Sequence, residues 1–270
     1  MTNTVTFEGL GLSVPVTRVA LSFLGINIYW YGIIIVAAVF SALLVALKNI
    51  KKVGITDDML YDFLLWAIPV SVIGARLYYV IYKFGDYRGD LIKVLYIWEG
   101  GIAIYGALIG AFISLLAYCF LKKIPAYDML DALSPTFILG QAIGRWGNFF
   151  NKEAYGSSCG NIFRMSFYDD RLGEYITNCH PTFLYESAWN LAGFFILMII
   201  YKRFRRFRGI VFYAFVLWYG LGRFFIEQLR TDSLMLGNMR VSALVAAVTA
   251  LLSVFIIAYR LLTITSAKSK

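Results

Sequence analysis

The sequence predicts an all-α protein that crosses a membrane about seven times and carries a small head outside the membrane. Two observations support this fold class. The 270 residues are 60% hydrophobic and only 15% charged, whereas a soluble domain has about 25% charged and roughly 45–50% apolar residues. This composition excludes a disordered chain and argues against a soluble globular enzyme. In addition, apolar runs of about 20 residues, the length that a bilayer requires, recur along the chain.

Seven apolar runs are long enough to span the bilayer as helices. Two of them, 59–82 and 129–150, contain Pro and Gly, which membrane helices tolerate. Residues 5–25 are weakly amphipathic, and we expect this segment to lie on the membrane surface. Together the runs predict a single membrane domain over residues 1–270. The predicted spans are 28–47, 59–82, 101–121, 129–150, 182–201, 209–229 and 241–262.

Lysine and arginine residues are distributed unequally between the loops on the two sides. One set of loops carries 13 of them against two acidic residues, whereas the other set carries nine basic and nine acidic residues. Because cytoplasmic loops are enriched in Lys and Arg, the first set is predicted to be cytoplasmic, with the N-terminus outside and the C-terminus inside. The net charge of +9 is therefore interpreted as a signal that orients the protein in the membrane. Since the cytoplasmic basic residues lie in short loops beside the spans, they do not indicate nucleic-acid binding.

The longest connection, residues 151–181, is predicted to lie outside the membrane as a small folded insertion. Its stretch 161–178 alternates enough to favour a short β-hairpin. Cys159 and Cys179 both fall in this connection. A disulfide between them is compatible with an extracytoplasmic location, and two unpaired thiols are an equal alternative. Two cysteines are too few to indicate a metal site, so no metal is expected.

Three arginines, Arg76, Arg145 and Arg223, lie inside predicted spans. At about 1.5 Å per residue, all three fall in the outer half of the bilayer. A charged side chain there is costly and indicates a functional site, although a single arginine near a span end also snorkels to the interface and interfacial tyrosines are ordinary. The number of polar groups at one depth favours a site. Those at the same level are Tyr29, Tyr31, Tyr105 and Glu186.

Helical spacing groups several of these residues. Tyr219, Arg223 and Glu227 are spaced i, i+4 and i+8 and share one helix face, and Arg145 and Asn148 share another. The arginine guanidinium is a fork of donors that suits phosphate oxygens, so the cluster predicts a site for an anionic phospholipid headgroup. These residues alone leave three readings open: a lipid-modifying enzyme, a phospholipid or anion transporter, and a structural membrane subunit. The inverted repeats with broken helices that transporters often contain are not visible in the sequence.

Residues 144–156 read GRWGNFFNKEAYG. This stretch resembles the signature of the prolipoprotein diacylglyceryl transferases, G-R-x-G-N-F-x-N-x-E-x-x-G, at every fixed position. Further similarities follow in order along essentially the whole chain. They are Trp30-Tyr31-Gly32, Gly74-Ala75-Arg76, Glu99-Gly100-Gly101 with Tyr105-Gly106, His180-Pro181-Thr182 with Leu184-Tyr185-Glu186, and Tyr219-Gly220-Leu221-Gly222-Arg223-Phe224 with Glu227 and Arg230.

The resemblance implies a transferase of the bacterial cytoplasmic (inner) membrane. Such enzymes transfer the diacylglyceryl group of phosphatidylglycerol to the thiol of the lipobox cysteine in a prolipoprotein signal peptide. The reaction takes place at the outer face of the cytoplasmic membrane. A thioether forms and glycerol phosphate leaves. The implied partners are therefore the membrane lipid phosphatidylglycerol and the prolipoprotein, with no nucleic acid. No metal or dissociable cofactor is expected.

The resemblance also implies roles for individual residues. Arg145 and Arg223 would stabilise the negative charge that develops on the leaving phosphate. The expected catalytic residues are Arg145, Arg223, Tyr31, Tyr105, Asn148, Glu153 and Glu227, and the expected substrate-binding residues are Arg145, Arg223, Gly156, Tyr219 and Arg76.

One position departs from the family pattern. Members often carry a histidine, proposed as the base for the thiol proton, where this chain has Tyr105. With a reference pKa of about 10, a tyrosine is a poor base at neutral pH. Either Tyr105 only donates a hydrogen bond or the thiol loses its proton by another route, with His180, the chain's one histidine, a weaker candidate because its His-Pro turn also fits a helix cap.

Overall fold

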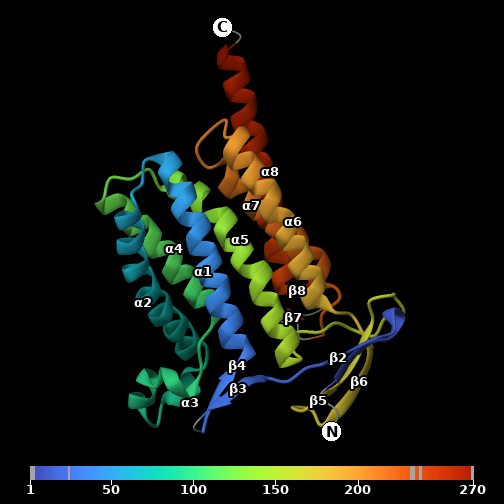
Figure 1. The fold of residues 1–270 in the computed structure, drawn as a ribbon. Helices are drawn as coiled ribbons and strands as arrows, with labels where there is room; N and C mark the ends of the chain where they lie inside the picture. The colour runs from blue at the N-terminus through green and yellow to red at the C-terminus, as the bar shows by residue number, and fades with distance from the viewer. Residues whose placement is uncertain (1–3, 24, 232–234, 237–238, 269–270) are drawn as a thin grey trace. The chain divides into compact units, whose positions relative to one another are not determined.

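A computed structural model describes residues 4–23, 25–231, 235–236 and 239–268 (Figure 1). The chain divides into two compact units. The first contains residues 1–46 and 133–270, and the second contains residues 47–132.

All seven predicted apolar runs form helices, with ends that differ from the predictions by a few residues. Six of them are long and apolar enough to cross a membrane, and α5 is not among these six. The protein is therefore mostly helical, with six candidate membrane-spanning helices in the described residues. The helices are α1 (Trp30–Ile50), α2 (Asp57–Tyr82), α4 (Ile104–Leu121), α5 (Ala126–Asn151), α6 (Thr182–Arg203), α7 (Ile210–Glu227) and α8 (Val241–Lys268).

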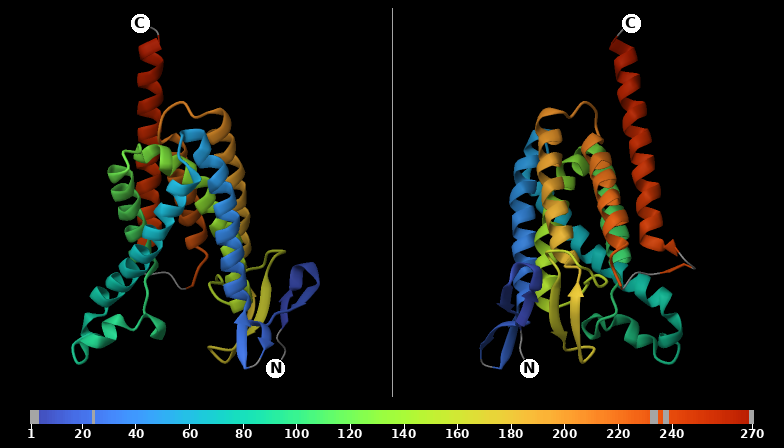
Figure 2. Two further views of the ribbon diagram at one scale, coloured as in Figure 1. Left: turned by 60° about the vertical axis from the view of Figure 1, so that its left-hand side comes forward. Right: turned by 90° about the vertical axis from the view of Figure 1, so that its right-hand side faces the viewer.

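A small antiparallel sheet corrects the all-α prediction. Its strand order is β2-β1-β5-β6, and the left view of Figure 2 shows its N-terminal and later strands side by side. The predicted hairpin within 161–178 is confirmed as β5 and β6. The sheet also contains the N-terminal residues that we expected on the membrane surface, since Val5 pairs with Phe167. The strands are β1 (Thr4–Phe7), β2 (Leu12–Pro15), β5 (Met165–Asp169) and β6 (Glu174–Cys179).

The N-terminal segment joins the sheet because its side chains alternate with the period of a strand. Val5 and Phe7 are buried, whereas Thr4 and Thr6, which alternate with them, are only half-buried. In the sequence alone, this alternation with a period of two is hard to distinguish from the weak amphipathicity of a segment that lies on a membrane surface. The buried side chains form one apolar cluster with Phe149 of α5 and Phe183 of α6, so the sheet packs on the ends of two helices that carry predicted site residues.

A second hairpin leads directly into the first helix. Strands β3 (Val19–Phe23) and β4 (Ile26–Tyr29) pair with each other, and α1 begins at the next residue, Trp30. A third, very short pair, β7 (Met235–Leu236) and β8 (Met239–Arg240), precedes α8.

Helices α6 and α7 are joined by two reciprocal hydrogen bonds. The indole Nε1 of Trp189 donates to the carbonyl of Trp218, and the indole Nε1 of Trp218 donates to the carbonyl of Trp189, both at 3.0 Å. Each indole occupies space that a glycine leaves open, because a Cβ at Gly193 or Gly222 would lie 2.3 Å from the opposite indole nitrogen. Two tryptophan–glycine pairs thus set the alignment of these helices.

The second unit contains α2 and α4, with a connection that includes α3 (Phe84–Tyr87) and the 3₁₀ helices η3 (Leu91–Leu95) and η4 (Ile97–Glu99). The two long helices approach closely because glycines face each other. A Cβ at Gly74 would lie 2.6 Å from the Gly106 carbonyl oxygen, and a Cβ at Gly106 would lie 2.2 Å from the Gly74 carbonyl oxygen. Small residues allow such backbone contact between membrane helices.

Candidate active site

Three arginines converge on one buried carboxylate in the first unit. Glu186 lies near the start of α6 and is 7% exposed. Its Oε2 lies 2.6 Å from Arg145 Nη2, while its Oε1 lies 3.3 Å from Arg230 Nη1 and 3.9 Å from Arg223 Nη1. The three cations come from α5, α7 and the segment after α7. One carboxylate cannot neutralise three guanidinium groups, so the cluster retains positive charge that an anionic ligand can balance.

Helix α7 presents a second carboxylate to this cluster. Arg223 Nη2 lies 2.8 Å from Glu227 Oε2, one helical turn further on, and Glu227 also accepts a hydrogen bond from the Ser242 hydroxyl. Tyr219, one turn before Arg223, lines a small cavity together with Arg223 and Glu186. The predicted common face of these three α7 residues is therefore present. Among the described residues, three arginines therefore face two glutamates, Glu186 and Glu227.

Helix α5 holds Arg145 against α6. The Ser187 hydroxyl donates to the Ala142 carbonyl at 2.8 Å and accepts a hydrogen bond from the Trp146 indole at 3.2 Å. On α5 these bonds lie on either side of Arg145, and on α6 they involve Ser187, the residue next to Glu186. They therefore fix how closely the two helices approach at the Arg145–Glu186 ion pair.

The end of α5 folds back toward Arg145. The helix ends at Asn151, and Lys152 and Ala154 then adopt positive φ angles of 52° and 56°, an uncommon backbone conformation for residues with a Cβ. This turn brings the Glu153 carboxylate over the preceding helical turn. Its Oε1 accepts hydrogen bonds from Asn148 Nδ2 at 2.8 Å and Asn151 Nδ2 at 3.2 Å. Asn148 Oδ1 in turn accepts from Arg145 Nη1 at 3.3 Å.

Two glycines of the 144–156 motif make room for neighbouring groups. A Cβ at Gly147 would lie 2.6 Å from the Tyr31 ring, so this glycine lets Tyr31 of α1 pack onto α5. A Cβ at Gly156 would lie 2.7 Å from the Leu229 carbonyl oxygen and 2.8 Å from His180 Cβ. Gly156 is thus required for close packing, while the predicted contact of Gly156 with substrate stays a prediction.

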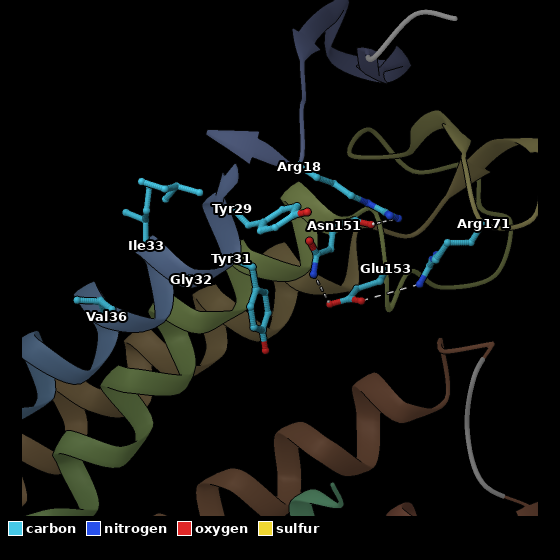
Figure 3. Close-up of a pocket in the computed structure, with 10 residues that line it drawn as sticks. Arg18, Tyr29, Tyr31, Gly32, Ile33, Val36, Asn151, Glu153 and Arg171 are labelled. Atoms are coloured by element: carbon cyan, nitrogen blue, oxygen red, sulfur yellow. Dashed lines mark hydrogen bonds and ion pairs between the residues drawn. The ribbon is translucent and has the colours of Figure 1, made fainter. Parts of the chain in front are cut away.

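Tyr31 and Glu153 line an open cavity of about 800 Å³. Figure 3 shows Arg18, Asn151, Glu153 and Arg171 gathered at one end, and Ile33 and Val36 of α1 at the other. Arg145 is not among the residues that line this cavity, but it connects to it through Asn148 and Glu153. The complete lining is Arg18, Ile28, Tyr29, Tyr31, Gly32, Ile33, Val36, Asn151, Glu153 and Arg171.

Two predicted site residues, Arg76 and Tyr105, belong to the second unit. Arg76 is 6% exposed and donates to the backbone carbonyls of Lys93, Val94, Gly100 and Gly101 at distances of 2.5–2.9 Å. Four of its five N–H donors are thereby used, which favours a structural role over substrate binding.

The ring of Tyr105 lies 6.3 Å from that of Tyr78, and the residue is 51% exposed. Within its own unit Tyr105 is therefore accessible.

His180 lies in the turn before α6. Its Nδ1 is 3.2 Å from Asn161 Nδ2 and 3.4 Å from the Tyr185 hydroxyl, and burial lowers the pKa of His180 below its ordinary value. The nearby Cys159 and Cys179 are free thiols in the structure. Burial raises the pKa of Cys179 to about 12, so this thiol is protonated at neutral pH.

Several polar residues at the site had been given no catalytic or binding role. Glu186 was predicted only to lie at the level of the site, and Arg230 was noted only as part of the family pattern. Arg18 and Arg171 lie outside every motif, and only the folded chain brings them to the cavity. These two residues carried no signal in the sequence.

The fold and the site define a class: a multi-pass membrane protein with a positively charged cluster where its helices α5, α6 and α7 meet. Residues 18–259 match the family model of the prolipoprotein diacylglyceryl transferases. The chain belongs to this family.

Similar proteins include the phosphatidylglycerol–prolipoprotein diacylglyceryl transferase of Listeria monocytogenes serotype 4b, with 45% identity over 91% of this chain and 90% of the relative. The proteins of the same name from Limosilactobacillus reuteri and Pediococcus pentosaceus are 45% and 43% identical. They cover 82% and 87% of this chain, and the matches extend over 83% and 87% of the relatives.

Proposed function

We propose that this protein transfers the diacylglyceryl group of phosphatidylglycerol to the thiol of the lipobox cysteine in prolipoproteins. The observation that carries the proposal is the convergence of Arg145, Arg223 and Arg230 on Glu186. A phosphate group has several oxygens for guanidinium donors, so it can share or replace the contacts that the carboxylate makes. The names of the relatives supply the donor and the acceptor.

In the proposed reaction the thiolate sulfur attacks the carbon of the diacylglycerol unit that bears the phosphate ester oxygen. The S–C bond forms, the C–O bond breaks, and glycerol phosphate leaves with the electron pair. Negative charge grows on the departing phosphate, and Arg145 and Arg223 stabilise it. The same positive field lowers the pKa of an incoming cysteine thiol, which reduces the demand on a separate base. The proposal therefore does not require Tyr105 to act as a proton acceptor.

The open cavity beside α1 is a suitable route for a lipid substrate. Its apolar end consists of α1 residues such as Ile33 and Val36, which are 41% and 69% exposed on a candidate membrane span. Its polar end contains Glu153, whose partners lead to Arg145. We assign Tyr31 to the cavity wall that contacts substrate, Tyr219 to the glycerol side near Arg223, and Glu153 and Glu227 to the orientation of the arginines.

We further propose seven spans, with α5 as the seventh. At about 1.5 Å per residue, its 26 residues cover roughly 39 Å, more than the hydrocarbon core of a bilayer. Its polar side chains, including Gln141, Arg145 and Asn148, lower its hydropathy, and its hydrogen bonds to α6 place it beside a candidate span. An odd number of spans places the two termini on opposite sides of the membrane, and the distribution of Lys and Arg favours the N-terminus outside and the C-terminus in the cytoplasm. Residues 151–181 are then an extracytoplasmic insertion in one inner-membrane domain.

The proposal is tested with purified protein in detergent, phosphatidylglycerol and a synthetic lipobox peptide. We expect a mass increase on the peptide equal to one diacylglyceryl group. A peptide with serine in place of the cysteine and a reaction with phosphatidylcholine as the only lipid are the controls, and neither should give product. Absence of product from wild-type protein would overturn the proposal, and movement of phosphatidylglycerol between leaflets without lipidation would favour a transporter.

A further inference from the structure

Arg171 of the β5–β6 hairpin is held by a buried carboxylate. It lies in the turn between β5 and β6, and its Nε and Nη2 lie 3.1 and 2.9 Å from Oδ1 and Oδ2 of Asp169. The backbone N–H of Arg171 also donates to Asp169 Oδ1 at 2.9 Å. Asp169 is fully buried. Burial alone would raise the pKa of Asp169, but the hydrogen bonds from Arg171 outweigh it and lower the pKa. The pair is therefore ionised at neutral pH.

The same guanidinium reaches the loop that follows α5. Arg171 Nη2 donates to the Lys152 carbonyl at 2.9 Å, and Arg171 Nη1 lies 3.8 Å from Glu153 Oε2. Lys152 is itself buried and donates from Nζ to the Tyr168 carbonyl on β5 at 3.2 Å. The two residues after α5 are thus attached to the hairpin on both sides.

These contacts continue without interruption to the arginine cluster. Glu153 Oε2 faces Arg171, while Glu153 Oε1 accepts from Asn148, and Asn148 accepts from Arg145. The Arg171–Glu153 ion pair is long and partly exposed, so it contributes little by itself. The shorter bond to the Lys152 carbonyl fixes the backbone that carries Glu153, and this contact does most of the positioning.

We propose that Arg171, anchored by Asp169, is a positioning residue for the transfer reaction: it fixes the Lys152–Glu153 turn, and thereby the Asn148–Arg145 pair that faces the leaving phosphate. This inference rests on the proposed function. Arg171 need not contact either substrate, since its effect passes through Glu153 to the residues that do.

The first test is Arg171→Ala, with Arg164→Ala as the matched control. Arg164 is also a hairpin-proximal arginine, and it pairs with Glu8 at 3.7 Å, away from the 152–153 turn. A displaced catalytic group costs up to about 100-fold in rate. We therefore expect Arg171→Ala to lower kcat by roughly 10- to 100-fold and to leave KM for phosphatidylglycerol within about twofold. Arg164→Ala should retain wild-type kcat.

The second test is a double-mutant cycle with Glu153→Gln. The glutamine keeps a carbonyl oxygen for Asn148 and Asn151 but loses the charge that attracts Arg171, and it changes no volume in the fold. We expect Glu153→Gln to lower kcat less than Arg171→Ala does. The double variant should have the same kcat as Arg171→Ala alone, because both changes act on one path. Arg171→Lys, which keeps the charge without the planar fork, should give an intermediate kcat.

The outcomes separate this inference from the proposed function. An inactive wild-type protein counts against the proposed function itself. Active wild-type protein with unchanged kcat in folded Arg171→Ala overturns the positioning role. Additive losses in the double variant show that Arg171 does not act through Glu153, which overturns the proposed path. A lower melting temperature with unchanged kcat shows that Arg171 only stabilises the hairpin. If Arg171→Ala does not fold, Arg171→Lys and Glu153→Gln decide the question, since full kcat in both also overturns the role.

Discussion

Two groups of helical arginines differ in what accepts their hydrogen bonds. In the second unit, Arg76 is almost fully buried and donates to four backbone carbonyls. In the first unit, Arg145 and Arg223 are paired with carboxylates and their side chains are 23% and 21% exposed. All three lie in spans that the sequence predicts, where a charge indicates function, but only the second arrangement leaves a cation that a ligand can reach.

The difference is chemical as well as geometric. Carbonyls on a folded backbone cannot leave, so a guanidinium bound to four of them is part of the scaffold. A carboxylate on a side chain can share its cations with an incoming phosphate, and the cluster around Glu186 holds more positive than negative charge. The identity of the acceptor, rather than the depth of the arginine, distinguishes a site from a structural link.

The largest expected effect is the loss of either carboxylate-paired arginine. Arg145→Ala and Arg223→Ala should each lower turnover by about 100-fold or more, because each removes a donor aimed at the developing phosphate charge. Arg145→Lys should recover little, since lysine lacks the planar fork. Lipidation of a lipobox peptide, followed by mass spectrometry, measures this. Turnover above about a tenth of wild type in either alanine variant would break the comparison, because such a loss is below that of a single charge-stabilising donor.

The next effect concerns the shared carboxylate. Glu186→Gln leaves three arginines without their common anion, so we expect lower stability from their mutual repulsion and about a 10-fold loss of turnover as their geometry loosens. Melting in detergent with and without excess phosphatidylglycerol separates the two effects. Added lipid should restore part of the lost stability if a phosphate occupies the place of the carboxylate. Equal melting temperatures with and without lipid would contradict this exchange.

Arg76→Ala tests the other side of the comparison. Removal of the guanidinium leaves four carbonyls without their donor, which should cost at least about 3 kcal/mol of unfolding free energy and lower the melting temperature by roughly 5–10 °C. The protein that remains folded should keep its KM for phosphatidylglycerol. A raised KM with an unchanged melting temperature would instead return Arg76 to substrate binding, as the sequence predicted.

Tyr105→Phe should have a smaller effect. If the hydroxyl were the base for the thiol proton, its removal would cost about 100-fold or more in turnover. We expect near wild-type turnover, since the arginine cluster lowers the pKa of the thiol. Initial rates across a pH series decide between the two, and a loss of that size at every pH would make the hydroxyl essential.

The smallest effect is a pH dependence of stability from His180. Burial lowers the pKa of His180 in the folded state below the ordinary value of 6.5, so the unfolded chain binds the proton more readily. Stability therefore falls as pH decreases through the range just below 6.5 and is unaffected above it. Melting at about pH 7.5 and about pH 5.5 should show a slightly smaller decrease for His180→Gln than for wild type. An identical decrease in both proteins would contradict a buried neutral His180.

The sequence predicted the helices well because the bilayer requires apolar runs of a known length, which are visible without any partner. It also predicted the common face of Tyr219, Arg223 and Glu227 on α7, since their spacing is local. The sheet was missed where it depends on distant residues: Val5 pairs with Phe167, and no local pattern connects them. The backbone acceptors of Arg76 were not visible for the same reason, because they lie 17–25 residues further along the chain, and its predicted role in substrate binding stays a prediction.

The tryptophan pair between α6 and α7 limits which insertions this protein can accept. Glu186 lies three residues before Trp189, and Arg223 lies one residue after Gly222. Since successive helical residues are rotated by about 100°, one residue added between Glu186 and Trp189 would turn the glutamate away from the arginines while both indole bonds stayed intact. A deletion there would act in the same way. An insertion or deletion between Glu186 and Trp189, or an insertion between Gly222 and Arg223, should therefore abolish activity. This holds even where the added residue is apolar and the helix remains long enough to cross the membrane.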